Sequence, residues 1–290
     1  MPESFPANPR PASTVVVLRD GSDRPEIFLV RRHESTAFMG GAHVFPGGRV
    51  DPSDATADPS WCDGLAHAHR QLAALPPGEA AAYHVAAARE LFEEAGALLA
   101  RTRDGQPVSF AGDSMRARFR QYRGDVYGHA LSLRAVMLRE QLRLALDELL
   151  LFAHWVTPPI DARQFDTRFF MARLPRGQVP AHDQTETTHS AWMTATAAIE
   201  EAQAGRIVLP PPTWTTLREL ESLKSVDDAM AWARQRRVVR RQPEVLERDG
   251  TRILLLPGDP LHSEHPGGDA PHETRFVSVD GRWRAERART

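Results

Sequence analysis

The sequence predicts an α/β protein, and two observations support this fold class. Short β-branched or apolar runs, bounded by turn-forming residues, are typical of strands. Longer alanine- or leucine-rich stretches carry apolar residues at helical spacing. Both kinds of segment occur along the 290 residues, which are enough for one large core or two modest ones.

The expected elements follow the chain in order. A hairpin is expected at 13–18 and 26–30, because residues 20–25 favour a turn between two apolar runs. The strongest helix is 79–95, which contains neither glycine nor proline and is followed by Gly96. Further helices are expected at 115–122, 131–150, 199–204, 213–223 and 226–236, and further strands at 152–157, 167–174, 252–256, 275–279 and 282–284.

These elements suggest three regions. Residues 1–12 are rich in proline and form a loose lead, and the main domain covers 13–240. Within this domain a polar insertion is expected at about 55–78, and a helical cap over the mouth of the site at about 113–150. Residues 241–290 are expected to form a small β-rich extension.

Composition excludes several classes of protein. A formal net charge of −2 gives no sign of general nucleic-acid binding, and the single cysteine excludes an internal disulfide. No apolar run approaches the ~20 residues of a membrane span, and the N-terminus does not resemble a signal peptide. A cytoplasmic location is therefore expected, and a homodimer stays open.

The most informative segment is R-E-L-F-E-E-A-G at residues 89–96. On a helix, Glu90, Glu93 and Glu94 share one face, and Arg89 lies four residues before Glu93. Clustered carboxylates repel one another unless a cation lies among them, and hard oxygen ligands suit Mg²⁺ or Mn²⁺. The alternative is a solvated acidic helix face, which is the commoner fate of such a pattern.

This segment resembles the second half of the Nudix signature, G-x5-E-x7-R-E-U-x-E-E-x-G-U, where U is aliphatic. The first half has a counterpart in residues 45–51, and counting five residues on from Gly48 leads to Asp54, where the family has Glu. Thirty-four residues (55–88) then replace the usual seven, and Ala97 replaces the last aliphatic position. A long insertion in the box is typical of a Nudix branch that includes the peroxisomal coenzyme A diphosphatase of animals. Short strings between about residues 13 and 223 resemble that branch.

The resemblance implies a Nudix α/β/α sandwich with a mixed sheet and a divalent metal, Mg²⁺ or Mn²⁺. A role for Asp54 is left open, with a surface position as the alternative. Only one of the two strand arginines is expected to face the site. The implied metal ligands are Glu90, Glu93, Glu94 and Glu186; the implied catalytic residues are Arg89, Glu90, Glu93 and Glu186; candidate substrate-binding residues are Arg31, Arg32, Gly47 and Gly48.

The implied activity is hydrolysis of a pyrophosphate bond in a nucleoside diphosphate derivative. Coenzyme A or an acyl-coenzyme A is the leading substrate by resemblance, and ADP-ribose and NADH are the alternatives. A catalytically silent nucleotide-binding module is a second hypothesis, although all three box glutamates are present. An RNA-end hydrolase is a third, and the net charge does not support it.

Overall fold

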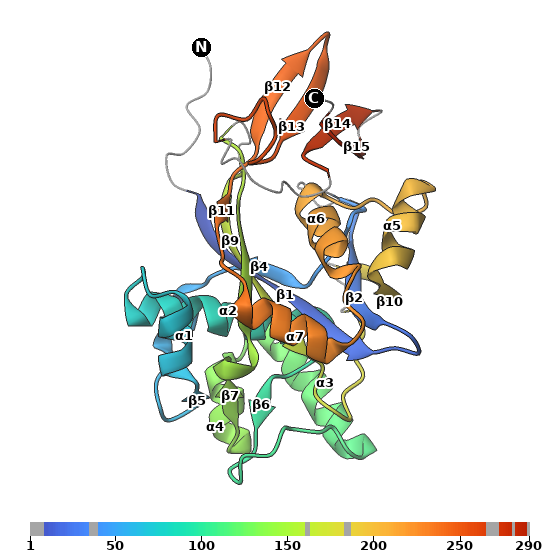
Figure 1. The fold of residues 1–290 in the computed structure, drawn as a ribbon. Coiled ribbons are helices and arrows are strands. Elements are labelled where there is room, and N and C mark those ends of the chain that lie inside the picture. Colours follow the sequence, from blue (N-terminus) through green and yellow to red (C-terminus); the bar gives the residue numbers. More distant parts are fainter. Residues whose placement is uncertain are drawn as a thin grey trace.

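The computed structural model describes residues 9–34, 40–159, 163–182, 187–264, 273–279 and 282–288. Its centre is a mixed sheet in the order β10-β2-β1-β9-β8-β11, in which β1 and β9 run parallel (Figure 1). These strands are β1 (Arg10–Asp20), β2 (Pro25–Arg32), β8 (Leu150–Val156), β9 (Phe165–Arg173), β10 (Thr187–Thr194) and β11 (Arg240–Arg241).

The strands β1 and β2 pair with each other near their connecting turn, and each pairs with a further short strand at its other end. The pairing of β1 with β2 is the one that the predicted hairpin requires. Further along, β3 (His43–Val44) pairs with β2, and β4 (Gly47–Arg49) pairs with β1. The segment from His43 to Arg49 therefore bridges β2 and β1, and it places two glycines against β1.

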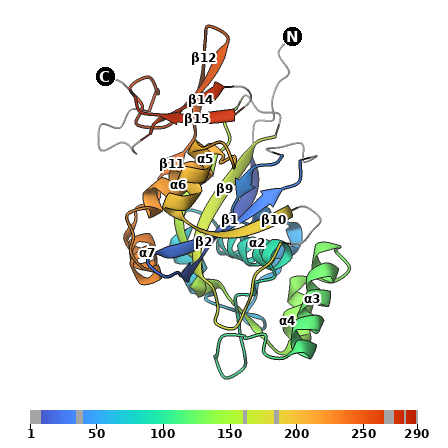
Figure 2. The ribbon, with the colours of Figure 1, turned by 90° about the vertical axis from the view of Figure 1, so that its right-hand side faces the viewer.

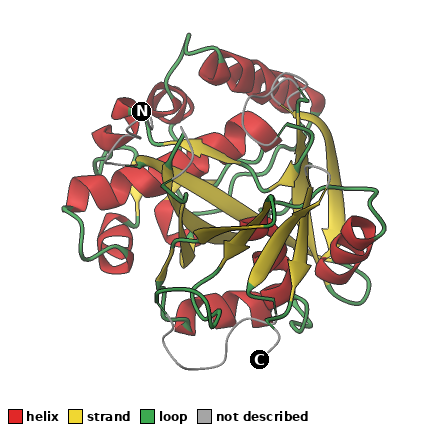
Figure 3. Ribbon diagram, turned by 90° about the horizontal axis from the view of Figure 1, so that it is seen from above, coloured by secondary structure: helices red, strands yellow, loops and turns green. Residues whose placement is uncertain are grey.

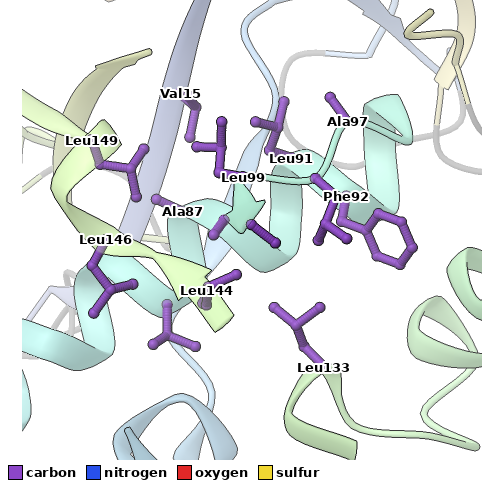
Figure 4. Close-up of a cluster of buried hydrophobic side chains, with 14 of the residues drawn as sticks. Val15, Ala87, Leu91, Phe92, Ala97, Leu99, Leu133, Leu144, Leu146 and Leu149 are labelled. Carbon is purple, nitrogen blue, oxygen red and sulfur yellow. The ribbon is translucent and has the colours of Figure 1, made fainter. Parts of the chain in front are cut away.

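One face of the sheet is covered by the long helix α2 (Pro77–Ala95). Its apolar side packs on Val15 and Val17 of β1, in a core that extends to Leu133 and Leu144 (Figure 4). The other elements beneath this face are the 3-10 turns η1 (Pro52–Thr56) and η2 (Leu146–Glu148), the helices α1 (Leu65–Gln71), α3 (Asp113–Tyr127) and α4 (Leu133–Glu140), and the strands β5 (Cys62–Asp63), β6 (Ala100–Arg101) and β7 (Arg143–Ala145).

The other face is covered by α5 (Ala195–Gln203), α6 (Pro211–Leu220) and α7 (Val226–Gln235). Apolar residues of these helices form a second core with β1, β2, β8 and β9. Viewed from above, helices lie on both sides of the strands (Figure 3). This arrangement confirms the predicted α/β/α sandwich.

A separate antiparallel sheet follows the sandwich, in the order β12-β13-β14-β15 (Figure 1). Leu254 and Phe276 bury their side chains in the second core, and Arg218 of α6 forms an ion pair with Glu273 at 3.2 Å. The predicted β-rich extension is thus confirmed. Its strands are β12 (Glu244–Arg248), β13 (Thr251–Leu255), β14 (Arg275–Val279) and β15 (Arg282–Glu286).

The structure differs from expectation most clearly at residues 131–150, where one helix was predicted. The helix α4 ends at Glu140, and Gln141 adopts a left-handed conformation with φ 54°. Of the leucines that follow, Leu144 lies in β7 and Leu150 and Leu151 lie in β8, because strand partners are available on either side. Among the described residues, every helix is too short or too polar to cross a membrane.

Candidate active site

The acidic motif lies in the C-terminal part of α2, and its side chains are buried. The relative exposures of Arg89, Glu93 and Glu94 are 6%, 6% and 5%. The alanine-rich sequence allows the helix to lie close to the sheet, and the helix ends at Gly96, which adopts φ 70°. Burial of this degree contradicts the alternative of a solvated acidic face. The carboxylates are held inside the protein, where their charge requires compensation.

Arg89 is the hub of the cluster. Its Nε–H and Nη2–H donate to the two carboxylate oxygens of Asp54, each at 3.0 Å. Its Nη1–H donates to Glu90 at 2.9 Å and to Glu93 at 3.1 Å, and Nη2–H also donates to the carbonyl of Arg49 at 2.8 Å. The planar fork of a guanidinium suits this arrangement, and a lysine would not reproduce it. The predicted orienting role of Arg89 therefore has a direct geometric basis.

Asp54 is a member of the site that the sequence left open. The residue is 1% exposed, and its second carboxylate oxygen also accepts a hydrogen bond from the Asp51 amide at 2.8 Å. The turn η1 presents Asp54 to Arg89 across 35 positions of sequence. A surface position for Asp54 is therefore wrong. Its signal in the sequence is the spacing of five residues from Gly48, which the long insertion after Asp54 leaves unchanged.

Gly47 and Gly48 let the backbone of β4 approach α2 closely. The Gly47 amide donates to Glu94 Oε2 at 2.9 Å. A Cβ atom at Gly48 would lie 2.4 Å from Glu90 Oε1, so a side chain here would displace that carboxylate. Glycine at position 48 is therefore required by the position of Glu90.

The cluster carries more negative than positive charge. Burial raises the pKa of Glu90 to about 8, although the charge of Arg89 opposes this, and burial also raises the pKa of Glu93. Burial raises the pKa of Asp54 as well. Desolvation alone would lower the pKa of Arg89, but the hydrogen bond to Asp54 and the neighbouring carboxylates raise it above its ordinary value. Each of the four groups therefore binds its proton more readily than an exposed group would, as expected where buried carboxylates surround one arginine.

The donor set fits a divalent metal by its chemistry. Glu90, Glu93 and Glu94 offer hard carboxylate oxygens in a buried region that lacks one or more positive charges. Within the described ranges, no group of three or more histidine, cysteine or acidic side chains is placed so that it could hold a metal ion. Glu186, the fourth predicted ligand, lies outside the described residues. Three of the four predicted metal ligands therefore lie in the described part of the chain, and their role stays a prediction.

Arg31 and Arg32 lie on opposite faces of β2. Val30 packs in the core on the side of α2, so strand alternation places Arg32 on that face. Leu29 packs in the opposite core, so Arg31 lies on the face of α5 and α6. The Nε atom of Arg32 is buried and has no hydrogen-bond partner within the described part of the chain. Arg32 is therefore the arginine that shares a face with the cluster on α2.

Comparison with known proteins adds independent findings. Residues 64–220 match the model of the NUDT19 Nudix domain. The chain is 27% identical to acyl-coenzyme A diphosphatase NUDT19 of Xenopus laevis, across 83% of this chain and 72% of that protein. It is 28% identical to the Homo sapiens protein of the same name, across 86% and 79%. A NUDIX hydrolase from Alicyclobacillus acidocaldarius has a similar structure, with a TM-score of 0.63 and 26% identity, across 77% of this chain and 96% of that one.

Proposed function

The chain belongs to the Nudix family and is a pyrophosphohydrolase, since the NUDT19 Nudix domain matches just over half of it, and we propose that it cleaves coenzyme A or an acyl-coenzyme A. The products would be 3′,5′-ADP and 4′-phosphopantetheine or its acyl form. The names of the similar proteins from Xenopus laevis and Homo sapiens support this choice of substrate.

One observation carries the proposed mechanism: a buried excess of carboxylates is arranged around Arg89 and lies against Gly48. We propose Glu90, Glu93, Glu94 and Glu186 as the residues that hold Mg²⁺ or Mn²⁺. When bound, such an ion neutralises charge on phosphate oxygens and lowers the pKa of a coordinated water.

The protein's own residues have separate tasks in this proposal. Arg89 holds the carboxylates of Glu90 and Glu93 in fixed orientations, which reduces the reorganisation needed during reaction. Glu90 accepts the proton of the attacking water, with Glu186 as the alternative base. A carboxylate within hydrogen-bond reach of a water can serve as its base. Arg32 contributes positive charge toward the pyrophosphate from the same face of the sheet.

Product analysis by mass spectrometry tests the substrate. The purified protein is incubated with Mg²⁺ or Mn²⁺ and with coenzyme A, acetyl-coenzyme A, ADP-ribose, NADH and capped RNA, in ¹⁸O-labelled water. We expect both coenzyme A thioester and free thiol to be cleaved, with ¹⁸O in one phosphate product and no cleavage in EDTA. Preferential cleavage of ADP-ribose or NADH would reject the coenzyme A proposal and keep the Nudix activity.

A matched pair of substitutions on α2 tests the site. Glu94→Gln removes one buried carboxylate charge, and turnover should fall at least about 100-fold with little change in the melting temperature. Glu79→Gln in the exposed first turn of the same helix is the control and should leave turnover unchanged. Equal activity of the two variants would refute the assignment of Glu94.

A further inference from the structure

Three neighbouring strands place basic side chains in one row. Arg31 of β2 pairs with His43 of β3 on one side and with His189 of β10 on the other. Residues paired directly across strands project from the same face of a sheet, with about 4.8 Å between strands. His43 and His189 therefore flank Arg31 at the end of β2. The strand β10, which carries His189, is the edge strand of the sheet (Figure 2).

This row is separate from the carboxylate cluster. It lies on the face covered by α5 and α6, whereas Glu90 and its neighbours lie on the face of α2. The same segment links the two places, because His43 precedes Gly47 by four residues, a span of at most ~13 Å in an extended chain. The row thus lies at the margin of the sheet, one short connection away from the proposed reacting centre.

His43 is the buried end of the row. The residue is 8% exposed, and its Nδ1 atom has no hydrogen-bond partner within the described part of the chain. Burial, together with the charges of Arg31 and His189, lowers the pKa of His43 to about 4. The two neighbours therefore act on the imidazole through a positive field. A neutral imidazole in that field still has an N–H to donate.

Exposure increases along the row. The Arg31 side chain is 39% exposed, and His189 is exposed at the outer end. The amide of His43 donates to the carbonyl of Val208, so the segment 207–213 lies beside it. This segment contains no acidic residue. The acidic partner found for Arg31 is Glu34, at 2.6 Å, and this side chain is largely exposed. A row that holds one arginine and two imidazoles, and whose one described acidic partner is largely exposed, is suited to an anion.

We propose that His43, Arg31 and His189 bind a phosphate monoester group. Three donors on neighbouring strands and one face of the sheet suit a tetrahedral dianion, and the guanidinium fork can meet two of its oxygens. The group is the ribose phosphate of the substrate, which is remote from the pyrophosphate that is cleaved. This identity rests on the proposed function, which supplies the nucleotide. Glu34 forms an ion pair with Arg31 when the phosphate is absent.

Calorimetric binding of 3′,5′-ADP, 5′-AMP and inorganic phosphate tests this inference without any need for turnover. The wild type should bind 3′,5′-ADP at least 10-fold more tightly than 5′-AMP. Arg31→Gln and His43→Gln should reduce this ratio to near one. Arg173→Gln, which removes a 40% exposed arginine from another part of the sheet, is the matched control and should keep the ratio. Glu34→Gln should increase the affinity for 3′,5′-ADP several-fold. Melting temperatures show whether each variant is folded.

The outcomes separate the sources of the phosphate. If inorganic phosphate binds with the same dependence on Arg31 while the two nucleotides bind alike, the row is a site for free phosphate, and the ribose assignment is overturned. If Arg31→Gln weakens both nucleotides equally, or weakens none of the three probes, the phosphate site itself is refuted. Loss of the ratio in Arg31→Gln, with no cleavage of coenzyme A by the wild type, would support the site and reject the proposed substrate.

Discussion

Replacing Gly48 by alanine should mainly reduce turnover, whereas replacing the adjacent Gly47 should mainly reduce stability. At Gly48 the added Cβ would lie 2.4 Å from Glu90 Oε1 and 2.6 Å from its carboxylate carbon. Ordinary contact begins near 3.4 Å, so the carboxylate must move by about 1 Å. A displacement of this size at a reacting group costs about 100-fold in rate. The end of a side chain can rotate away, so the loss of stability should be only about 1 kcal/mol.

At Gly47 the added Cβ would meet main-chain atoms. The carbonyl oxygen of Ser13 lies at 2.5 Å and the Cα of Thr14 at 2.8 Å, and both belong to β1 in the middle of the sheet. Neither atom can move without shifting the paired strands. Overpacking of this kind costs about 3 kcal/mol, the upper end of the usual range. Gly47→Ala should therefore lower the melting temperature by several degrees.

Both variants can be compared by urea unfolding and by coenzyme A turnover at a temperature where each is folded. The expected result is a folded, inactive Gly48→Ala and a destabilised Gly47→Ala. If Gly48→Ala keeps full activity, Glu90 either does not need its position or does not take part in the reaction. If Gly47→Ala is as stable as the wild type, the packing of β4 against β1 is looser than the structure indicates.

Two further predictions concern buried charges. Asp54→Asn removes the charge from the fork with Arg89 and should lower the free energy of unfolding by about 2 kcal/mol, measured in urea, and unchanged stability would contradict a structural role for the pair. His84 is fully buried, donates from Nδ1 to the carbonyl of Ala80 and has its pKa lowered by burial from 6.5 to about 4. Because protonation favours the unfolded chain, stability is intact above pH 6.5 and falls by about 3 kcal/mol as the pH drops to 4. His84→Gln should flatten this part of the pH profile, and an unchanged slope would place the titration elsewhere.

The carboxylate helix was predictable because its signal is local. Three glutamates and an arginine within six residues share a face whenever that segment is helical, and the alanine-rich sequence before them favours a helix. The sequence predicts that Arg31 and Arg32 lie on opposite faces of the strand, but it does not predict which of them faces α2. Alternation shows that they separate, but the side on which α2 packs is a tertiary fact. The pairing of Arg31 with His43 and His189 depends on strand register and has no local signature.

The prediction failed where tertiary partners decide between helix and strand. Residues 142–151 contain leucines at spacings that suit both, and the pairing of β7 and β8 selects the strand. The strand β10 was not predicted, because polar residues such as Thr187 and Ser190 give it no clear alternation. It forms because β2 offers a free edge to a segment that contains Ala191 and Trp192.

The insertion within the Nudix box shows why spacing in sequence is a weaker requirement than contact in space. Extending the connection between Asp54 and Arg89 from seven residues to 34 adds only about 1.4 kcal/mol of loop-closure free energy. Trp61 and Leu72 of the insertion are buried in the same core as α2, and burial of such side chains contributes about 2 kcal/mol each before their own ordering is counted. The insertion therefore packs on the helix that it interrupts in sequence. Asp54 still reaches Arg89 at 3.0 Å, because packing delivers it there in place of a short loop.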